Sequence, residues 1–283
     1  MGRTESLTEV DWASVQLPDV WPDALNLGSP LTWLQLYRRS RKAGSQKVRL
    51  PEGLIGADRI PEYILLEFHG LPNGNYSNSV ARGYARSFDH VMLGTLSRAR
   101  QRIAKALTPA RTVLDVGCGG GRMAQALQQV GVAEVRGIDP SPYLLQVAAQ
   151  SVPGAHFQQG LAEALEQADT SVDGLTACFV LHEMPPPRVD EALAEFFRVL
   201  RPGGRFGLIE PSRVQWTWTA TRLLRRYGWK GLYFRWMAGL VREPFLEAWH
   251  RRDIVASLQA AGFVVESDIE GCPLREIVAL KPA

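Results

Sequence analysis

The sequence has little cysteine and no long apolar run, and both shortages restrict what the protein can be. Its 283 residues include only three cysteines, Cys118, Cys178 and Cys272. They lie far apart, which argues against a disulfide framework and favours reduced thiols. No segment of about 20 residues is apolar and uncharged, so we expect no membrane-spanning helix. The first ten residues lack the apolar core of a secretory signal, and we expect a cytoplasmic protein.

The sequence also lacks a strong excess of either charge. It has 32 Lys and Arg against 29 Asp and Glu, a formal charge of +3, and 46% apolar residues. This charge is too small to indicate nucleic-acid binding, and the apolar content excludes a disordered chain. No His, Cys, Asp and Glu set has the spacing of metal ligands, so we expect no metal. The length suits one large domain or two small ones.

The centre of the chain alternates strand and helix patterns. Helices are expected over residues 121–130, 142–150, 188–200 and 250–261. Short apolar runs predict strands at 112–116, 134–139, 156–159, 174–181, 205–210, 263–269 and 276–280. Strands that alternate with helices imply crossover connections. We therefore predict an α/β domain, with a mostly parallel sheet and helices on both of its faces.

Two further regions have a different character. Residues 1–108 are expected to form an N-terminal helical cap that covers the substrate, with helical runs at 31–41 and 80–108. The core is expected over 109–283, with an aromatic-rich helical lid at about 213–249. The segment 213–242 contains seven basic residues and no acidic one. Three interpretations are open: a lid packed on the core, an apolar or aromatic substrate pocket, and contact with an anionic membrane surface.

A glycine-rich turn follows the first predicted strand. Its glycines, at 117, 119 and 121, let the backbone approach a ligand closely, and the following helix offers free N–H groups. Asp115 lies in the strand just before the turn, where a carboxylate needs a partner. Asp139 ends the next strand, about 20 residues on, where an acid can accept hydrogen bonds from ribose hydroxyls. The pattern indicates a nucleoside or nucleotide site, and a simple strand-to-helix turn is the alternative.

Five segments, in order and at the right spacing, resemble the motifs of class I S-adenosylmethionine-dependent methyltransferases. The likeness is greatest to ubiquinone/menaquinone-type and other small-molecule enzymes. The segments are residues 113–121, 137–145, 160–163, 171–182 and 197–206. The resemblance implies a Rossmann-like, mostly parallel seven-stranded sheet, with S-adenosylmethionine as the cofactor.

The resemblance also implies roles for single residues in cofactor binding. Asp115 would hold the amino-acid end, and Asp139 the ribose hydroxyls. One departure from the family is Leu161, which stands where an Asp usually accepts from the adenine amino group. The remaining residues of the implied cofactor site are Gly117, Cys118 and Gly119 near the methionine and ribose, Pro140 against adenine, Ala162 and Glu163 in the adenine loop, and the backbone near Phe179.

Methyl transfer from a sulfonium is an in-line displacement, so positioning matters most and a general base helps. His182, after the fourth predicted strand, is the candidate base, and a structural histidine is the alternative. His69 and Tyr76 lie with Asn78 in a loop of small polar residues. They are candidates for the catalytic site, and a surface loop is the alternative. Tyr84, Phe88 and Asp89 are expected either to close over the cofactor or to pack in the core.

We expect methyl transfer to oxygen or carbon of a small, apolar or aromatic metabolite. The alternatives are an enzyme acting on a lipophilic quinone or lipid at a membrane surface, and a non-catalytic subunit that binds S-adenosylmethionine. The Asn- or Asp-Pro-Pro-aromatic tetrapeptide of enzymes that methylate base amino groups is absent, because residues 177–180 read Ala-Cys-Phe-Val. The expected partner is a small-molecule acceptor, without nucleic acid or stable membrane insertion. Peripheral membrane contact and a homodimer are both compatible with the sequence.

Overall fold

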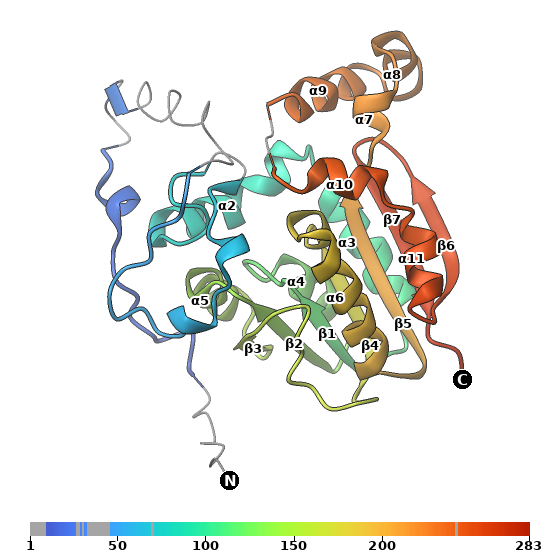
Figure 1. The fold of residues 1–283 in the computed structure, drawn as a ribbon, viewed down its shortest axis with the longest axis horizontal. Helices are drawn as coiled ribbons and strands as arrows, with labels where there is room; N and C mark the ends of the chain where they lie inside the picture. The colour runs from blue at the N-terminus through green and yellow to red at the C-terminus, as the bar shows by residue number, and fades with distance from the viewer. Residues whose placement is uncertain (1–9, 27–28, 30, 33–45, 69–70, 241–242) are drawn as a thin grey trace.

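A seven-stranded sheet with helices on both faces forms the body of the molecule (Figure 1). The structure is a computed structural model, and it describes residues 10–26, 29, 31–32, 46–68, 71–240 and 243–283. The expected α/β fold with a mostly parallel sheet is confirmed.

The strands run in the order β3-β2-β1-β4-β5-β7-β6. The first five pair in parallel, and β7 is antiparallel to both of its neighbours. Every residue of β1 is buried, as expected for a central parallel strand covered on both faces. The strands are β1 (Thr112–Val116), β2 (Glu134–Asp139), β3 (His156–Gln159), β4 (Val172–Cys178), β5 (Leu200–Pro211), β6 (Val264–Glu270) and β7 (Leu274–Leu280).

Two layers of helices cover the sheet. One layer holds α3 (Thr95–Ala106), α4 (Arg122–Gln129) and α5 (Pro142–Ser151). The other holds α6 (Pro186–Val199), α10 (Leu246–Arg251) and α11 (Ile254–Ala260). The helix α3 lies very close to β5, because a Cβ built at Gly207 would be 2.3 Å from Ile103 Cγ2. A larger residue at 207 would therefore push α3 off the sheet.

The segments outside this body form the N-terminal region and the lid. The helix α2 (Asn78–Val91) packs against α5. Figure 1 shows the lid helices beyond α10 and away from the sheet. No described helix is both long and apolar enough to cross a bilayer. The remaining helices are η1 (Trp21–Ala24), η2 (Ala57–Arg59), η3 (Glu62–Ile64), η5 (Leu181–Glu183), α7 (Val214–Thr217), α8 (Ala220–Tyr227) and α9 (Trp229–Ala238).

Two sequence expectations need correction, and two others need comment. The strand expected over 174–181 ends at Cys178, because Phe179 has a φ of 61° and turns the chain out of the sheet. The helix expected over 250–261 is two helices, since the Asp253 carboxylate caps α11 by accepting from Ala256 N at 3.1 Å. The run at 31–41 lies mostly outside the described residues. The boundary at 108/109 stays a prediction, although α3, just before it, packs on β5 and β7.

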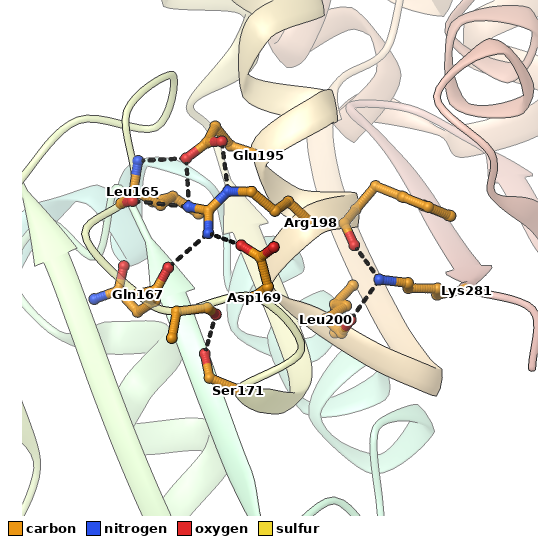
Figure 2. A network of polar contacts seen from close by, with 10 residues as sticks. Leu165, Gln167, Asp169, Ser171, Glu195, Arg198, Leu200 and Lys281 are labelled. Carbon is orange, nitrogen blue, oxygen red and sulfur yellow. Dashed lines mark hydrogen bonds and ion pairs between the residues drawn. The ribbon is translucent and has the colours of Figure 1, made fainter.

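Arg198, near the end of α6, holds the loop that follows β3 (Figure 2). Its guanidinium donates to the carbonyls of Leu165 and Gln167, each at 2.8 Å. It also donates to both Glu195 oxygens, each at 2.7 Å. Lys281 Nζ donates to the Leu200 carbonyl at 2.8 Å and to the Phe197 carbonyl at 2.7 Å, near the end of α6 (Figure 2). The Arg198 contacts fix the loop containing residues 160–170 against α6, and the Lys281 contacts hold the C-terminal end of the chain against the same helix.

We predict that Arg198→Met lowers the free energy of unfolding by about 2 kcal/mol, because two carbonyls and two carboxylates, those of Glu195 and Asp169, lose a charged donor. Urea unfolding followed by circular dichroism measures the change. The matched control is Arg188→Met, since the exposed Arg188 forms an ion pair with the exposed Glu191 on the same helix. This control should leave stability unchanged. Equal losses in the two variants would contradict the structural role of Arg198.

Candidate functional site

A cavity of about 160 Å³ lies at the carboxyl ends of β1, β2 and β4. The strand order reverses here, because β2 lies on one side of β1 and β4 on the other. Loops that leave the sheet at such a point diverge and leave a crevice for a ligand. The walls of this cavity come from the glycine turn, the strand ends, residues 160–163 and the segment between η3 and α2. We call it the main cavity.

The glycine turn places backbone that carries no side chains at the edge of the main cavity. Gly117 and Gly119 have φ angles of 64° and 52°, in the left-handed region that favours glycine. A Cβ at Gly117 would lie 2.4 Å from Val180 Cγ2, so a side chain there would clash. A Cβ at Gly119 would meet nothing within 4 Å. The space beside Gly119 is therefore open to a ligand group.

Two buried aspartates lie next to this turn. Asp139 accepts from Gly119 N at 2.9 Å and from Ser141 N at 2.8 Å. Burial raises the pKa of Asp139 to about 6. Asp115 accepts from Thr176 Oγ1 at 2.8 Å, and burial raises its pKa to about 7. Asp115 is thus only partly ionised near neutral pH, and a cationic group beside it would favour the ionised form.

Four buried polar atoms on the cavity wall have no hydrogen-bond partner among the described residues. They are Asn75 Oδ1, Tyr76 Oη, Asp115 Oδ2 and Glu163 Oε2. An unsatisfied buried polar group costs about 1–3 kcal/mol. A ligand with several donor groups, such as an ammonium, hydroxyls and an amine, would satisfy these atoms. The wall therefore fits a polar, nucleoside-like molecule.

All of the residues expected at the cofactor site line the main cavity. Their individual roles stay predictions. Glu163 Oε1 accepts from Tyr63 Oη at 2.6 Å, which ties the adenine loop to the N-terminal region. Burial raises the pKa of the Cys118 thiol, so this cysteine packs as a neutral group. The nine residues are Asp115, Gly117, Cys118, Gly119, Asp139, Pro140, Ala162, Glu163 and Phe179.

The expected catalytic residues have different environments. Tyr76 lines the main cavity, and burial raises its pKa well above 10, so it keeps its proton. Tyr84, Phe88 and Asp89 line the cavity as well. His69 lies outside the described residues. Asn78 is not on the wall, because its amide donates to Asp19 Oδ1 at 2.8 Å.

His182 is fully buried between two glutamates and does not line the main cavity. Its Nδ1 is 2.5 Å from Glu210 Oε2, and its Nε2 is 3.3 Å from Glu243 Oε2. Burial alone would lower the pKa of His182, but the two carboxylates outweigh it and raise the pKa well above 6.5. The imidazole therefore holds a proton near neutral pH. A role as general base remains a prediction.

A second, smaller cavity of about 70 Å³ lies beneath the lid helices, and we call it the lid cavity. Phe88 and Phe179 line both cavities, and their rings meet edge to face with centroids 5.6 Å apart. Most of the remaining wall is apolar, with Gln215 and Glu243 as the polar members. The Gln215 Oε1 atom is buried and has no hydrogen-bond partner. The lid cavity thus offers an apolar space with few polar contacts.

Two buried charged residues were missed in the sequence: Arg100, on the wall of the main cavity, and Glu210, which contacts His182 away from the wall. Arg100 is buried, lines the main cavity and donates to Asp89 Oδ1 at 2.6 Å. It lies on α3 between Leu96 and Ile103, so helical spacing could have shown that it faces inward. Glu210 lies near the end of β5, a position like that of Asp139 on β2. Among the described residues, no group of three or more His, Cys, Asp and Glu side chains could hold a metal ion.

The fold and the main cavity together indicate the class of protein to which this domain belongs. Residues 113–204 match the family model described as a methyltransferase domain. This part of the chain is a methyltransferase domain of the class I S-adenosylmethionine-dependent type, whose cofactor is S-adenosylmethionine. The residues present fit that cofactor, because its ammonium, ribose hydroxyls and adenine amine supply the donors that the wall lacks.

Three curated relatives show the similarity in more detail. An uncharacterized methyltransferase of Synechocystis is 41% identical over 108 residues, covering 38% of this chain and 50% of the relative. A ubiquinone/menaquinone biosynthesis C-methyltransferase of Methylobacterium nodulans is 38% identical over 152 residues, covering 48% and 60%. A demethylmenaquinone methyltransferase of Chlorobaculum parvum is 33% identical over 114 residues, covering 40% and 46%. The chain spans about half the length of these relatives.

Solved structures share the fold. A methyltransferase from Aquifex aeolicus has a TM-score of 0.52 at 18% identity, covering 73% of this chain and 99% of its own. The [4+2]-cyclase SpnF has a TM-score of 0.50 at 20% identity, covering 74% and 97%. At these identities the likeness is one of fold alone. Since one of the two is named for a cyclisation, the fold does not define the reaction.

We predict that S-adenosylhomocysteine binds about tenfold more weakly at about pH 6 than at about pH 8. The ligand's ammonium favours ionised Asp115, whose pKa is about 7, so affinity falls as the pH drops through that value. Calorimetry at several pH values measures the change. Asp115→Asn is the control, and its affinity should vary only where Asp139 titrates, near its pKa of about 6. A constant affinity of the unmodified protein across this range would contradict the prediction.

Proposed function

We propose that the protein transfers a methyl group from S-adenosylmethionine to oxygen or carbon of a small, apolar or aromatic acceptor. One observation carries the proposal. A polar cavity with four unpaired buried atoms adjoins an apolar cavity, and the two share the rings of Phe88 and Phe179. A polar cofactor and an apolar acceptor would then meet at these rings.

The cofactor side is formed by the ends of the strands. When bound, S-adenosylmethionine supplies an electrophilic methyl group on a sulfonium. We assign Asp115 to its ammonium, Asp139 to its ribose hydroxyls and the open backbone at Gly119 to close contact with its chain. Tyr76, protonated and unpartnered, donates a hydrogen bond at the cavity wall. These groups hold the cofactor and leave the lid side free for the acceptor.

The acceptor side is formed by the lid. Phe234, Met237 and Trp216 exclude water from the lid cavity. We assign the Glu243 carboxylate to the acceptor hydroxyl, with the protonated His182 behind it at 3.3 Å. The bound cofactor would supply its methyl group to the acceptor oxygen or carbon, with the methyl–sulfur bond broken and S-adenosylhomocysteine left behind. Glu243 would take the proton that the acceptor releases.

A lipophilic quinone or a lipid is the second candidate acceptor. The names of two relatives, which refer to ubiquinone, menaquinone and demethylmenaquinone, support a quinol nucleus. The largely apolar wall of the lid cavity supports it too. The remaining alternative, a non-catalytic subunit, would bind the cofactor product without transferring a methyl group.

The first test is calorimetry of S-adenosylhomocysteine on Asp139→Ala. We expect at least a tenfold loss of affinity, about 1.4 kcal/mol, because the ribose loses its anchor. The matched control is Asp173→Ala. Asp173 also accepts from backbone N–H groups, those of Arg111 and Thr112, but it lies at the opposite end of the sheet. Micromolar binding that is unchanged by Asp139→Ala would exclude the assigned ribose site.

The second test measures S-adenosylhomocysteine release with S-adenosylmethionine and two probes, 1,4-naphthohydroquinone and a simple phenol. We predict that Glu243→Gln lowers kcat by at least about tenfold, the scale of general-base catalysis. The control Glu247→Gln, on the exposed face of α10, should leave kcat unchanged.

S-adenosylhomocysteine affinity should be the same in the unmodified protein and in both variants. Intact binding with no release from either probe would favour the non-catalytic alternative. Equal kcat values for Glu243→Gln and the unmodified protein would remove Glu243 from the mechanism.

A further inference from the structure

The helix α9 has apolar residues on its outer face as well as its inner face. Trp229, Leu232 and Trp236 are spaced by three and four residues, so they follow one side of the helix, and Leu240 lies two residues beyond its end. They are exposed, with 61%, 62% and 62% of Trp229, Trp236 and Leu240 accessible. Leu224 of α8 is exposed too. We call these five residues the lid patch. Apolar groups gathered in this way usually mark a contact surface.

The charged residues of the segment that carries the lid patch all have the same sign. Segment 213–242 contains no Asp or Glu. Arg225, Arg226 and Lys230 make no ion pair with any described residue, and Lys230 lies 6.0 Å from the ring of Trp229. Arg222 stacks on Trp218 with its guanidinium carbon 3.6 Å from the ring centre. Basic side chains can extend their charges past an apolar surface on which they lie. The lid therefore presents tryptophan and unneutralised positive charge together.

The opposite side of the same helix roofs the lid cavity. Phe234, Met237 and Ala238 are part of the cavity wall, while Trp236 between them faces outward. Tyr233 holds the helix in place by donating to the Val91 carbonyl at 2.8 Å. Figure 1 shows α8 and α9 at the edge of the molecule, clear of the sheet. A surface lying against α9 would be separated from the acceptor cavity by one helix.

We propose that α8 and α9 dock the protein on an anionic membrane surface, from which a lipophilic acceptor enters the lid cavity. Amphipathic helices of this kind bind by burying tryptophan and leucine at the headgroup level, while Lys and Arg face anionic lipid. Charge complementarity favours an anionic membrane over a second copy of the chain as the group that covers the lid patch. A second copy of the chain at the same patch would bring the basic side chains against one another. The inference rests on the proposed function only for the nature of the acceptor.

The test is co-sedimentation with sucrose-loaded vesicles of phosphatidylcholine containing about one third phosphatidylglycerol. We expect the protein to bind these vesicles but not pure phosphatidylcholine, and about 0.5 M salt to release it. The variant Trp229→Ala/Trp236→Ala and the variant Arg225→Glu/Arg226→Glu should each lower the bound fraction at least about fivefold. The control Val264→Ala/Ile269→Ala changes two exposed apolar residues on β6 and should bind normally.

S-adenosylhomocysteine affinity of every variant shows that it is folded. Because vesicle binding needs no cofactor, its failure is distinct from failure of the proposed function. No binding to anionic vesicles, or equal binding by the tryptophan variant, would overturn the proposal. Concentration-dependent dimerisation that the tryptophan variant abolishes, without vesicle binding, would overturn it in favour of a second copy.

Discussion

The reversal of strand order at β1 is the constraint on which the rest of the site depends. The chain leaves β1 toward β2 and returns to β4 on the other side, so the loops above these strands separate. Asp115 and Asp139 end in this gap because both lie in strands that run in the same direction. Burial raises the pKa of Asp115 to about 7 and that of Asp139 to about 6, so Asp115 is the acid that is only partly ionised near neutral pH.

Local signals in the sequence predicted the framework well. Apolar runs located all seven strands, and Gly117, Gly119, Asp115 and Asp139, for which the sequence predicts a ligand site, line the main cavity. The errors came where local and tertiary preferences differ. The run that forms β4 stays apolar to Leu181, yet Phe179 leaves the sheet with a positive φ and the chain turns into η5. Apolar character reports burial, and a buried residue need not belong to a strand.

Contacts between distant segments could not be predicted, because nothing in the local pattern encodes them. Tyr63 donates a hydrogen bond to Glu163, which lies 100 residues later in the chain. Glu243, which follows the lid helices, forms an ion pair with His182 of η5. The second contact changes how His182 is understood. In the sequence it was a histidine at a strand end, whereas in the structure two carboxylates surround it and favour its protonated form. Only the fold reveals which of its two nitrogens faces which acid.

The two cavities take their walls from different kinds of structure. The main cavity is built from strand ends spread over much of the chain, while much of the lid cavity wall comes from one continuous segment that leaves the sheet after β5. Substitutions in that segment can reshape the lid cavity without moving Asp115 or Asp139. In the proposed function, where the lid cavity holds the acceptor, selection for a new acceptor would act on one continuous stretch of chain. Exchanging residues 213–246 between related proteins would then transfer acceptor preference as a unit.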